Sequence, residues 1–230
     1  MRYVVVKYTL DRLLAAVGLV VAAPALAVLA AIVRIDSAGP ALFRQRRIGQ
    51  DGRPFTLYKL RTMYVDAPPY SLKVRNQDPR VTRVGSLLRR TALDEIPQLW
   101  NIVRGEMSWV GPRPEQPFLV QRYAPWQRAR LRARPGLTGW WQVCHRGDER
   151  MHEHTELDIY YVDHISPWLD ATIVLLTPWA LWRQDHASAA VSRGASGRVD
   201  PGADAWPPSR TGCPRAVEPA RVPAEVYGPG

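Results

Sequence analysis

The hydrophobic pattern of the chain is dominated by one apolar run, residues 13–33 (LLAAVGLVVAAPALAVLAAIV). The run contains no charged residue, and a helix of this length can cross the hydrocarbon core of a bilayer. Pro24 lies near the centre of the run, where a proline removes a backbone hydrogen bond and bends a helix. The pattern therefore predicts a membrane helix with a break near its middle.

Three arrangements of this run compete. The basic start and Ala25-Leu26-Ala27 are typical of a cleaved signal peptide, but Asp11 interrupts the basic region and the run is too long. Hydropathy alone favours a simple transmembrane helix. Positive charge on both sides of the run favours a re-entrant helix hairpin whose two ends lie on the cytoplasmic face. These charges are Arg2, Lys7 and Arg12 before the run, and Arg34, Arg44, Arg46 and Arg47 after it.

The rest of the chain shows shorter patterns of both strand and helix type. Residues 55–63 (FTLYKLRTM) alternate as a strand does, which would place Lys59 and Arg61 on the same face. Residues 168–183 (WLDATIVLLTPWALWR) are apolar around Pro178. They fit either a helix pair on the membrane surface or a buried core helix. We therefore expect a mixed, helix-rich α/β body.

From about Ala187 the sequence is rich in Ala, Gly, Pro, Ser and Arg and has almost no apolar pattern. Such a segment cannot bury enough apolar surface to offset the entropy of ordering, so we expect a disordered tail. The chain then divides into a membrane helix over residues 1–35, one folded cytoplasmic domain over residues 36–185, and a tail over residues 186–230.

The formal net charge of +10 lies in the part of the chain before Asp185, because from Asp185 to the end five arginines balance five acids. A basic body beside an apolar anchor suggests an anionic membrane surface and phosphorylated ligands. Nucleic acid is the other common partner of a basic protein, but the chain carries no RNA- or DNA-binding motif. We therefore expect no nucleic-acid partner.

The stretch Thr91 to Glu115 carries the most chemistry. It sets Asp94 and Glu95 just before Pro97, which fits a helix only in its first turn, so a helix should start near Asp94. The unpaired N–H groups of that helix end keep an acid ionised and attract anions. An ionised carboxylate beside an anion site can act as a nucleophile toward phosphorus. Taken alone, the pair is better explained by Asp94 as an ordinary N-cap and Glu95 as a solvated first-turn acid.

The surrounding blocks remove this ambiguity, because in their order they resemble the bacterial sugar transferase family of monotopic phosphoglycosyl transferases. The resemblance covers roughly residues 8–180 and is closest to the short form of the family. Its blocks are DSAGPALFRQRRIG, FTLYKLRTM, DPRVTRVGSLLRRT, TALDEIPQLWN with IVRGEMSWVGPRPE, RPGLTGWWQV and ELDIYYVDHISPWLD. It implies a re-entrant membrane helix, although the family's Ser-Pro at the break is Ala23-Pro24 here.

The resemblance implies an enzyme that transfers a sugar-1-phosphate from a UDP-sugar to a polyprenyl phosphate of the undecaprenyl type, releasing UMP. The reaction would begin exopolysaccharide or glycan synthesis at the cytoplasmic face of the bacterial inner membrane. In this interpretation Asp94 is the nucleophile that forms an aspartyl phosphosugar. Asp94 and Glu95 hold Mg²⁺, and Glu95 alternatively positions or deprotonates the acceptor. The folded domain, residues 36–185, is then catalytic.

Six further residues are expected to bind the substrate, chiefly on the strength of the resemblance: Lys59, Arg61, Arg113, Arg134, Arg146 and Asp158. Arg113, stiffened by Pro112 and Pro114, suits phosphate or uracil recognition, or else pairs with Glu115. Asp158 has a polar contact between helices as its alternative. His145, His152 and His154 are treated as surface residues, because the His-x-His spacing is a weak metal signal and the expected metal, Mg²⁺, is held by carboxylate and phosphate oxygens.

A non-catalytic membrane-surface adaptor with the same fold is the alternative from another functional class. The intact Asp94-Glu95 pair and its basic partners argue against it. The chain is also expected to bind the membrane and to form a possible homodimer. The sequence does not identify the sugar, because few residues shape a sugar pocket.

Overall fold

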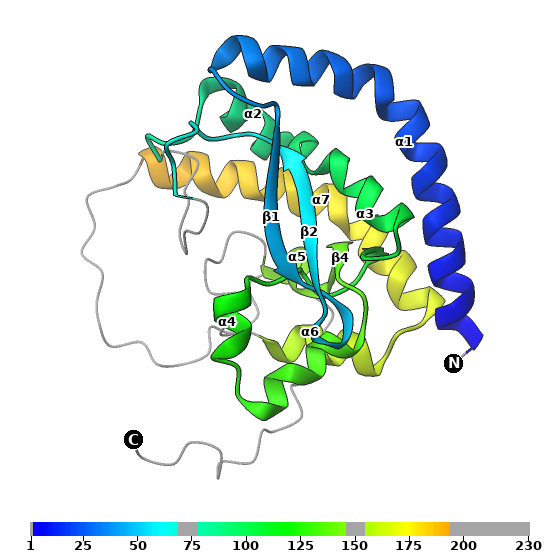
Figure 1. Cartoon of the computed structure of the whole chain (residues 1–230). Helices are drawn as coiled ribbons and strands as arrows, with labels where there is room; N and C mark the ends of the chain where they lie inside the picture. The colour runs from blue at the N-terminus through cyan, green and yellow to red at the C-terminus, as the bar shows by residue number, and fades with distance from the viewer. Residues whose placement is uncertain (1, 69–77, 146–154, 194–230) are drawn as a thin grey trace, which may run out of the picture.

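The computed structural model describes residues 2–68, 78–145 and 155–193. One long helix, α1, runs along the outside of a body built from short helices and two small sheets (Figure 1). The α-helices and strands are α1 Arg2–Asp36, β1 Leu42–Ile48, β2 Pro54–Leu60, α2 Arg83–Thr91, α3 Leu99–Val103, β3 Ser108–Val110, α4 Pro117–Gln121, β4 Gly136–Thr138, α5 Trp140–His145, α6 Thr155–Asp163 and α7 Pro167–Arg193. The 3₁₀ helices are η1 Gln50–Gly52, η2 Leu93–Gln98 and η3 Pro125–Arg132.

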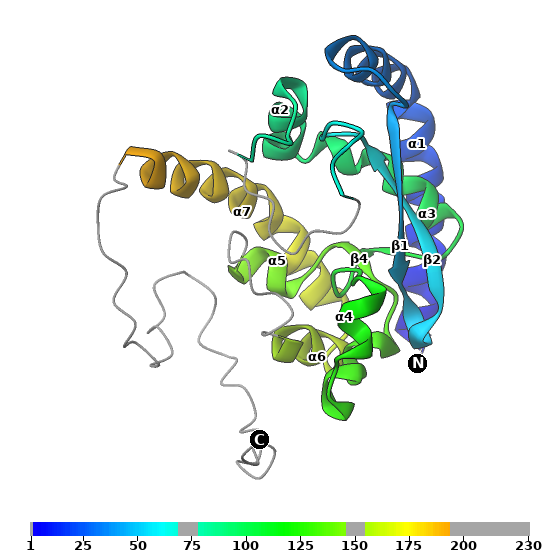
Figure 2. The same ribbon diagram turned by 60° about the vertical axis from the view of Figure 1, so that its left-hand side comes forward.

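Helix α1 contains Pro24 and is bent, so that it has two arms (Figures 1 and 2). The first arm buries Ala15 in a cluster with Leu99 and Ile102 of α3. The second arm buries Val33 against Leu60 and Leu88, from β2 and α2. The break that the sequence predicts is therefore present, and each arm packs on a different part of the body.

Most of the apolar surface of α1 faces away from the body. It is the one helix in the described part of the chain that is long and apolar enough to cross a membrane, with a mean hydropathy of 2.6 over its most apolar window. Only 6% of that window is buried. The most exposed side chains of the run, each at least 60% exposed, are Leu13, Leu14, Val17, Val20, Val21 and Val28. A surface of this kind is stable in contact with lipid.

Buried polar contacts fasten the N-terminal arm of α1 to the body. Lys7 Nζ lies 3.0 Å from Asp170 Oδ2 on α7, and the Tyr3 hydroxyl donates to the same carboxylate at 2.6 Å. Asp11 accepts a hydrogen bond from the hydroxyl of Ser108 on β3. The Trp109 indole donates to the Asp11 carbonyl at 3.2 Å. Polar groups at the start of an otherwise apolar helix are thus satisfied by the folded body.

A second set of contacts holds the other end of α1. Arg61, just after β2, donates to the carbonyl of Pro40 and to both oxygens of Ser37, each at 2.7 Å. Asp36, the last residue of α1, accepts the backbone N–H of Val84 in the first turn of α2 at 3.3 Å. Both ends of α1 are therefore bound to one body.

Strands β1 and β2 form an antiparallel hairpin in which Leu42 is opposite Leu60. The predicted alternation is present, because Phe55 and Leu57 on one face of β2 are buried against α1 and α3, and Lys59 follows on the same face. The strand ends at Leu60, three residues before the end of the strand-like pattern at Met63.

The second sheet pairs β3 with β4 in parallel, with α4 and η3 in the connection between them. The largest of the hydrophobic clusters includes Val110 of β3. In it, Trp140 and Trp141 of α5 pack with Tyr161 of α6 and Ile173 of α7. Helix α7 lies across this cluster as one continuous element, although it contains Pro178. Its buried face fits the core-helix prediction, while Trp168 and Leu175 lie exposed on its other side.

The architecture confirms the expected mixed, helix-rich α/β class, with small sheets and one N-terminal apolar helix. The described part of α7 extends to Arg193, past residue 186 where the tail was expected to begin. Residues 194–230 lie outside the described part of the chain.

Candidate active site

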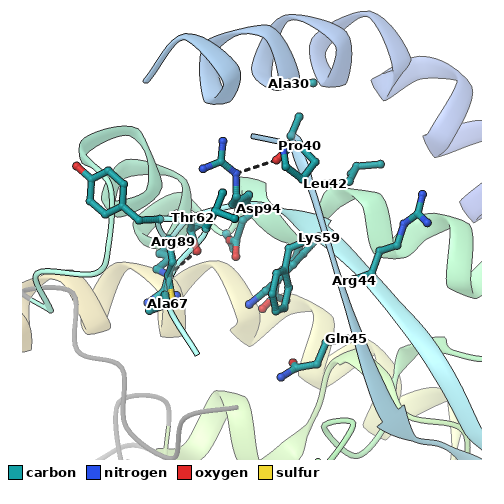
Figure 3. Close-up of a pocket in the computed structure, with 18 of the residues that line it drawn as sticks. Ala30, Pro40, Leu42, Arg44, Gln45, Lys59, Thr62, Ala67, Arg89 and Asp94 are labelled. Atoms are coloured by element: carbon teal, nitrogen blue, oxygen red, sulfur yellow. Dashed lines mark hydrogen bonds between the residues drawn. The ribbon is translucent and has the colours of Figure 1, made fainter. Parts of the chain in front are cut away.

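A cleft of about 1290 Å³ opens between the second arm of α1, the β1–β2 hairpin, η2 and α5. Its lining changes in character along its length. Ala27, Ala30 and Ala31 of α1 form an apolar end, and Gln45, Gln116, Trp141 and Gln142 supply uncharged polar groups elsewhere. The charged residues of the lining include Arg47, Lys59, Arg89, Asp94, Glu95 and Arg113. Figure 3 shows Asp94 and Lys59 between Ala30 on one side and Gln45 on the other.

Asp94 and Glu95 lie in the first turn of η2, directly before α3, as the position of Pro97 predicts. Ala92 between α2 and η2 has a positive φ of 56°, which turns the chain sharply. Glu95 N–H donates to the Ala92 carbonyl at 3.1 Å and closes that turn. The turn brings the end of α2 next to the two carboxylates, and Asp94 becomes 6% exposed.

The electrostatics of Asp94 differ from the expectation that a helix end simply keeps it ionised. Burial and the neighbouring charge of Glu95 raise the pKa of Asp94 to about 6. Lys59, Arg89 and Arg113 lower it and offset part of this rise. With a pKa of about 6 Asp94 is mostly ionised at neutral pH; the three cations favour this form, while burial and Glu95 oppose it.

Lys59 is the cation that β2 places in the cleft. Burial lowers its pKa to about 8, with Arg89 and Arg47 acting in the same direction and Asp94 opposing them. Its ammonium lies 5.4 Å from the centre of the Phe43 ring. A partly desolvated ammonium beside a carboxylate gains much from an added anion, since neither group is well solvated.

Arg89 on the last turn of α2 is a functional candidate that the sequence analysis did not single out. Its Nε donates to the Thr62 hydroxyl at 2.8 Å, and burial lowers its pKa while Asp94 raises it. The signal for it was present in the block DPRVTRVGSLLRRT, five residues before Asp94. The turn at Ala92 that joins the two could not be read from that spacing.

Arg113 reaches the cleft from a loop whose backbone is fixed residue by residue. Its side chain lies 3.4 Å from Glu95 Oε1, not beside Glu115 as the alternative prediction had it. Each carbonyl of residues 112–115 accepts a hydrogen bond; the donors, in order, are Gly136 N at 2.8 Å, Arg130 Nη2 at 2.9 Å, Arg47 Nη1 at 3.1 Å and Ile48 N at 2.9 Å. The guanidinium is therefore carried by a rigid segment.

A series of buried ion pairs packs against this loop. Asp158 on α6 pairs with Arg130, which also lies 3.4 Å from Glu115 Oε2. Glu115 in turn lies 3.9 Å from Arg47 Nη1. Burial raises the pKa of Asp158, while Arg130 lowers it. These ion pairs link α6 to the β1–β2 hairpin, which forms one wall of the cleft.

The structure places three expected substrate-binding residues, Arg61, Arg134 and Asp158, outside the charged centre of the cleft or away from it. Arg61 lines the cleft, but its donors are bonded to Ser37 and Pro40, as described above. Arg134 is not part of the lining; its guanidinium carbon lies 4.1 Å from the centre of the Tyr8 ring on α1. Asp158 is buried against Arg130, and Arg146 lies outside the described residues.

A magnesium ion fits the two carboxylates of the cleft. Both offer oxygen ligands of the type that Mg²⁺ prefers, and the repulsion that raises the pKa of Asp94 would fall if a dication lay between them. Among the described residues no group of three or more His, Cys, Asp or Glu side chains could hold a metal. Other ligands would therefore come from substrate phosphates and water, as is usual for Mg²⁺.

Comparisons with known proteins identify the family to which the chain is similar. The model of the family described as "Bacterial sugar transferase" matches residues 2–184. The UDP-glucose:undecaprenyl-phosphate glucose-1-phosphate transferase of Caulobacter vibrioides is 44% identical over 191 residues, covering 79% of this chain and 71% of that protein. The UDP-N-acetylgalactosamine-undecaprenyl-phosphate N-acetylgalactosaminephosphotransferase of Aeromonas hydrophila is 36% identical over 184 residues, covering 76% and 43%.

A third relative, the galactosyl transferase CpsE of Streptococcus agalactiae, is 38% identical over 188 residues, covering 76% of this chain and 42% of that protein. The chain thus spans less than half the length of two of these relatives. The three names differ in the sugar, while two of them share undecaprenyl phosphate.

The position of Asp158 leads to a prediction about stability. Asp158→Ala should lower the free energy of unfolding by about 3–5 kcal/mol, because it leaves Arg130 as a buried charge without its closest partner. Denaturant unfolding of the detergent-solubilised protein measures this loss. Asp163→Ala is the matched control, since Asp163 lies on the same helix but pairs at the surface with Arg132 of η3, and it should cost about 1 kcal/mol or less. Equal costs for both variants would contradict a structural role for Asp158.

Proposed function

The chain belongs to the bacterial sugar transferase family, and we propose that it transfers a sugar-1-phosphate from a UDP-sugar to a polyprenyl phosphate of the undecaprenyl type. The products are a polyprenyl-diphosphate sugar and UMP. The observation that carries the proposal is one cleft bounded by the membrane helix at one end and by a buried Asp94 with its cations in the middle. A lipid-borne phosphate and a water-soluble nucleotide can reach the same atom there.

The main barrier to this reaction is repulsion, because an anionic carboxylate must approach an anionic diphosphate. Lys59, Arg89 and Arg113 converge on Asp94 and place positive charge where the diphosphate must lie. They do so in a site of low polarity, where such charges act more strongly than in water. The rigid loop under Arg113 reduces the cost of holding its guanidinium in place.

In the first step an Asp94 carboxylate oxygen attacks the sugar-bearing phosphorus. The new bond joins that oxygen to phosphorus, and the bond from phosphorus to the bridging oxygen of UMP breaks, so UMP leaves with the electron pair. The product is an aspartyl phosphosugar. Arg113 and Lys59 stabilise the charge that moves onto the leaving phosphate.

In the second step an oxygen of the polyprenyl phosphate attacks the same phosphorus, and the bond to Asp94 breaks. The carboxylate is regenerated, and the two large substrates never need to be bound together. The apolar end of the cleft at Ala27, Ala30 and Ala31 lets the acceptor approach along α1 from the membrane. Mg²⁺, held by Asp94 and Glu95 with substrate phosphates, would supply charge neutralisation at the diphosphate.

We further propose that α1 is re-entrant and that both of its ends lie at the cytoplasmic face of the inner membrane. Tyr3, Lys7 and Asp11 at one end, and the carbonyls that bind Arg61 at the other, are bonded to the same body. A helix that crossed the bilayer would place one of these ends on the far side, away from its partners. The bend at Pro24 and the positive charge around both ends support the same arrangement. The catalytic domain then begins at about residue 36 and includes α7, which extends to Arg193.

Asp94→Asn should abolish turnover, because an amide has the shape of the carboxylate but cannot attack phosphorus. UMP release from a UDP-sugar in membrane fractions should fall by more than about 1000-fold, a loss of roughly 4 kcal/mol or more of transition-state stabilisation. Asp51→Asn, an exposed acid outside the cleft lining, is the matched control and should keep wild-type activity. Asp94→Asn activity within tenfold of wild type at equal membrane abundance would exclude the nucleophile role. A wild-type protein that releases no UMP from any UDP-sugar would favour the non-catalytic adaptor.

The pKa of Asp94 leads to a prediction about pH dependence. Because the carboxylate must be ionised and its pKa is raised to about 6, kcat/KM for the UDP-sugar should rise with pH through about 6 and level off above it. Glu95→Gln removes a like charge and should move this limb to lower pH. Arg89→Met removes an opposing charge and should move it to higher pH. Arg90→Met, the neighbouring arginine outside the cleft lining, is the control and should move it much less. Shifts of the same sign in the Glu95 and Arg89 variants would contradict this electrostatic balance.

The topology of α1 is tested by chemical labelling. Arg2→Cys and Arg53→Cys place thiols at exposed positions on either side of the apolar run, and a membrane-impermeant maleimide should label both only after the cells are opened. The wild-type chain, with Cys144 and Cys213, gives the background. Labelling of Arg2→Cys alone in intact cells would establish a simple transmembrane span.

A further inference from the structure

Three residues of the cleft lining carry polar groups that have no partner inside the protein. Gln116, Trp141 and Gln142 line the cleft and are 8%, 6% and 2% exposed. Gln116 Oε1, Trp141 Nε1, Gln142 Nε2 and Gln142 Oε1 are all buried and make no hydrogen bond. In the described part of the chain seven buried side-chain polar atoms lack a partner, and these are four of them. Most of the unpaired polar atoms therefore belong to residues of the cleft lining, and this distribution needs a physical reason.

Such groups are costly, because each lost its hydrogen bonds to water on burial. An unpaired buried amide or indole N–H destabilises a protein by about 1–3 kcal/mol, so proteins keep few of them. The arginines of the same cleft, by contrast, have partners. Arg89 donates to Thr62 and Arg113 pairs with Glu95. The guanidinium of Arg61 donates to Ser37 and Pro40. In the cleft lining the unpaired groups belong to uncharged side chains: two amides, which can accept and donate, and one indole, which only donates.

The chemistry of these side chains selects the ligand. Two amides and an indole carry no charge, so they cannot neutralise a phosphate, but they match a neutral ring that both donates and accepts hydrogen bonds. The charged centre of the cleft already serves the diphosphate, and the apolar end at α1 serves a lipid chain. The part of a nucleotide sugar left unassigned is its neutral hydrogen-bonding ring, either the sugar hydroxyls or the uracil imide.

We propose that Gln116, Trp141 and Gln142 form the subsite that binds a neutral hydrogen-bonding ring of the donor and contributes to donor selectivity. The inference rests on the proposed function, because it assumes a nucleotide-sugar donor. Gln142 lies close to the start of the loop that carries Arg113. A Cβ built on Gly139 would meet Gln142 Oε1 at 2.7 Å and the Gly111 carbonyl at 2.1 Å. The four polar atoms are covered in the free protein. The amide torsions have broad minima, so a turn of the glutamine side chains presents them to the ring.

The test uses two substitutions in the subsite and one matched control. Gln142→Met keeps the length of the side chain and removes its amide, and Trp141→Phe removes the indole N–H. Trp140→Phe is the control, because Trp140 is adjacent, equally buried and also has an unpartnered indole N–H, but does not line the cleft. The full-length protein is compared in membrane fractions for turnover and in detergent for thermal unfolding.

Both subsite variants should raise KM for the UDP-sugar about 3- to 15-fold, the range expected for one neutral hydrogen bond, with a smaller change in kcat. Their thermal midpoints without ligand should be unchanged or higher, because the atoms removed make no internal hydrogen bond. A side chain with a purely structural role would lower the midpoint instead. Trp140→Phe should leave KM within about twofold of wild type.

Two further arms identify the ring. If Gln142→Met changes the preference among UDP-glucose, UDP-galactose and their N-acetyl forms while inhibition by UMP is unchanged, the subsite holds the sugar. If inhibition by UMP weakens by the same factor as KM and the sugar preference is unchanged, it holds uracil. Unchanged KM and inhibition in both variants, or equal effects in Trp140→Phe, would overturn the proposal.

A separate readout keeps this test independent of the proposed reaction. The rise in thermal midpoint on adding a UDP-sugar measures binding without turnover. If the wild-type protein binds UDP-sugars but releases no UMP, the proposed function fails while the subsite is still tested by the smaller rise in the variants. If no UDP-sugar raises the wild-type midpoint, the subsite proposal fails as well.

Discussion

The cleft depends on the attachment of both ends of one apolar helix to the same folded body. Lys7 and Asp11 are paired with Asp170 and Ser108 at the start of α1, and the carbonyls near its end are bound by Arg61. These are polar contacts next to a surface that is otherwise suited to lipid, so their loss would leave buried polar groups unpaired. Because both ends are held, α1 must bend, and its second arm comes to lie over the charged residues of the body.

The bent helix alone would not make a reactive site. The reactivity proposed for Asp94 depends on opposing influences on its carboxylate: burial and Glu95 destabilise the charge, while Lys59, Arg89 and Arg113 stabilise it. The balance leaves a carboxylate that is ionised at neutral pH yet only weakly solvated, which suits an attack on phosphorus. The same cations provide the charge that a diphosphate needs. In the proposed mechanism, one group of residues therefore sets the electrostatics of both the carboxylate and the diphosphate that it attacks.

Sequence reasoning found the parts of this site that depend on local patterns. Pro97 placed the helix start near Asp94, and the alternation of β2 placed Lys59 correctly on the face that continues toward the cleft. The prediction for Arg61 used the same alternation, but β2 ends at Leu60, and its guanidinium is bonded to the end of α1. Arg89 was missed because its approach to Asp94 depends on the positive φ of Ala92, which the sequence pattern does not predict. Arg134 and Asp158 lie outside the cleft lining, with Tyr8 and Arg130 as partners that only the tertiary fold brings near.

The central claim is that Asp94 carries the phosphosugar between the two substrates. The direct measurement is intact-protein mass spectrometry after rapid mixing of the purified protein with a UDP-sugar, without acceptor. The account predicts an added mass equal to one sugar-1-phosphate, located on the peptide that contains Asp94, formed together with one equivalent of UMP and discharged by polyprenyl phosphate. UMP release that requires the acceptor, with no added mass on the protein at any time, would contradict it.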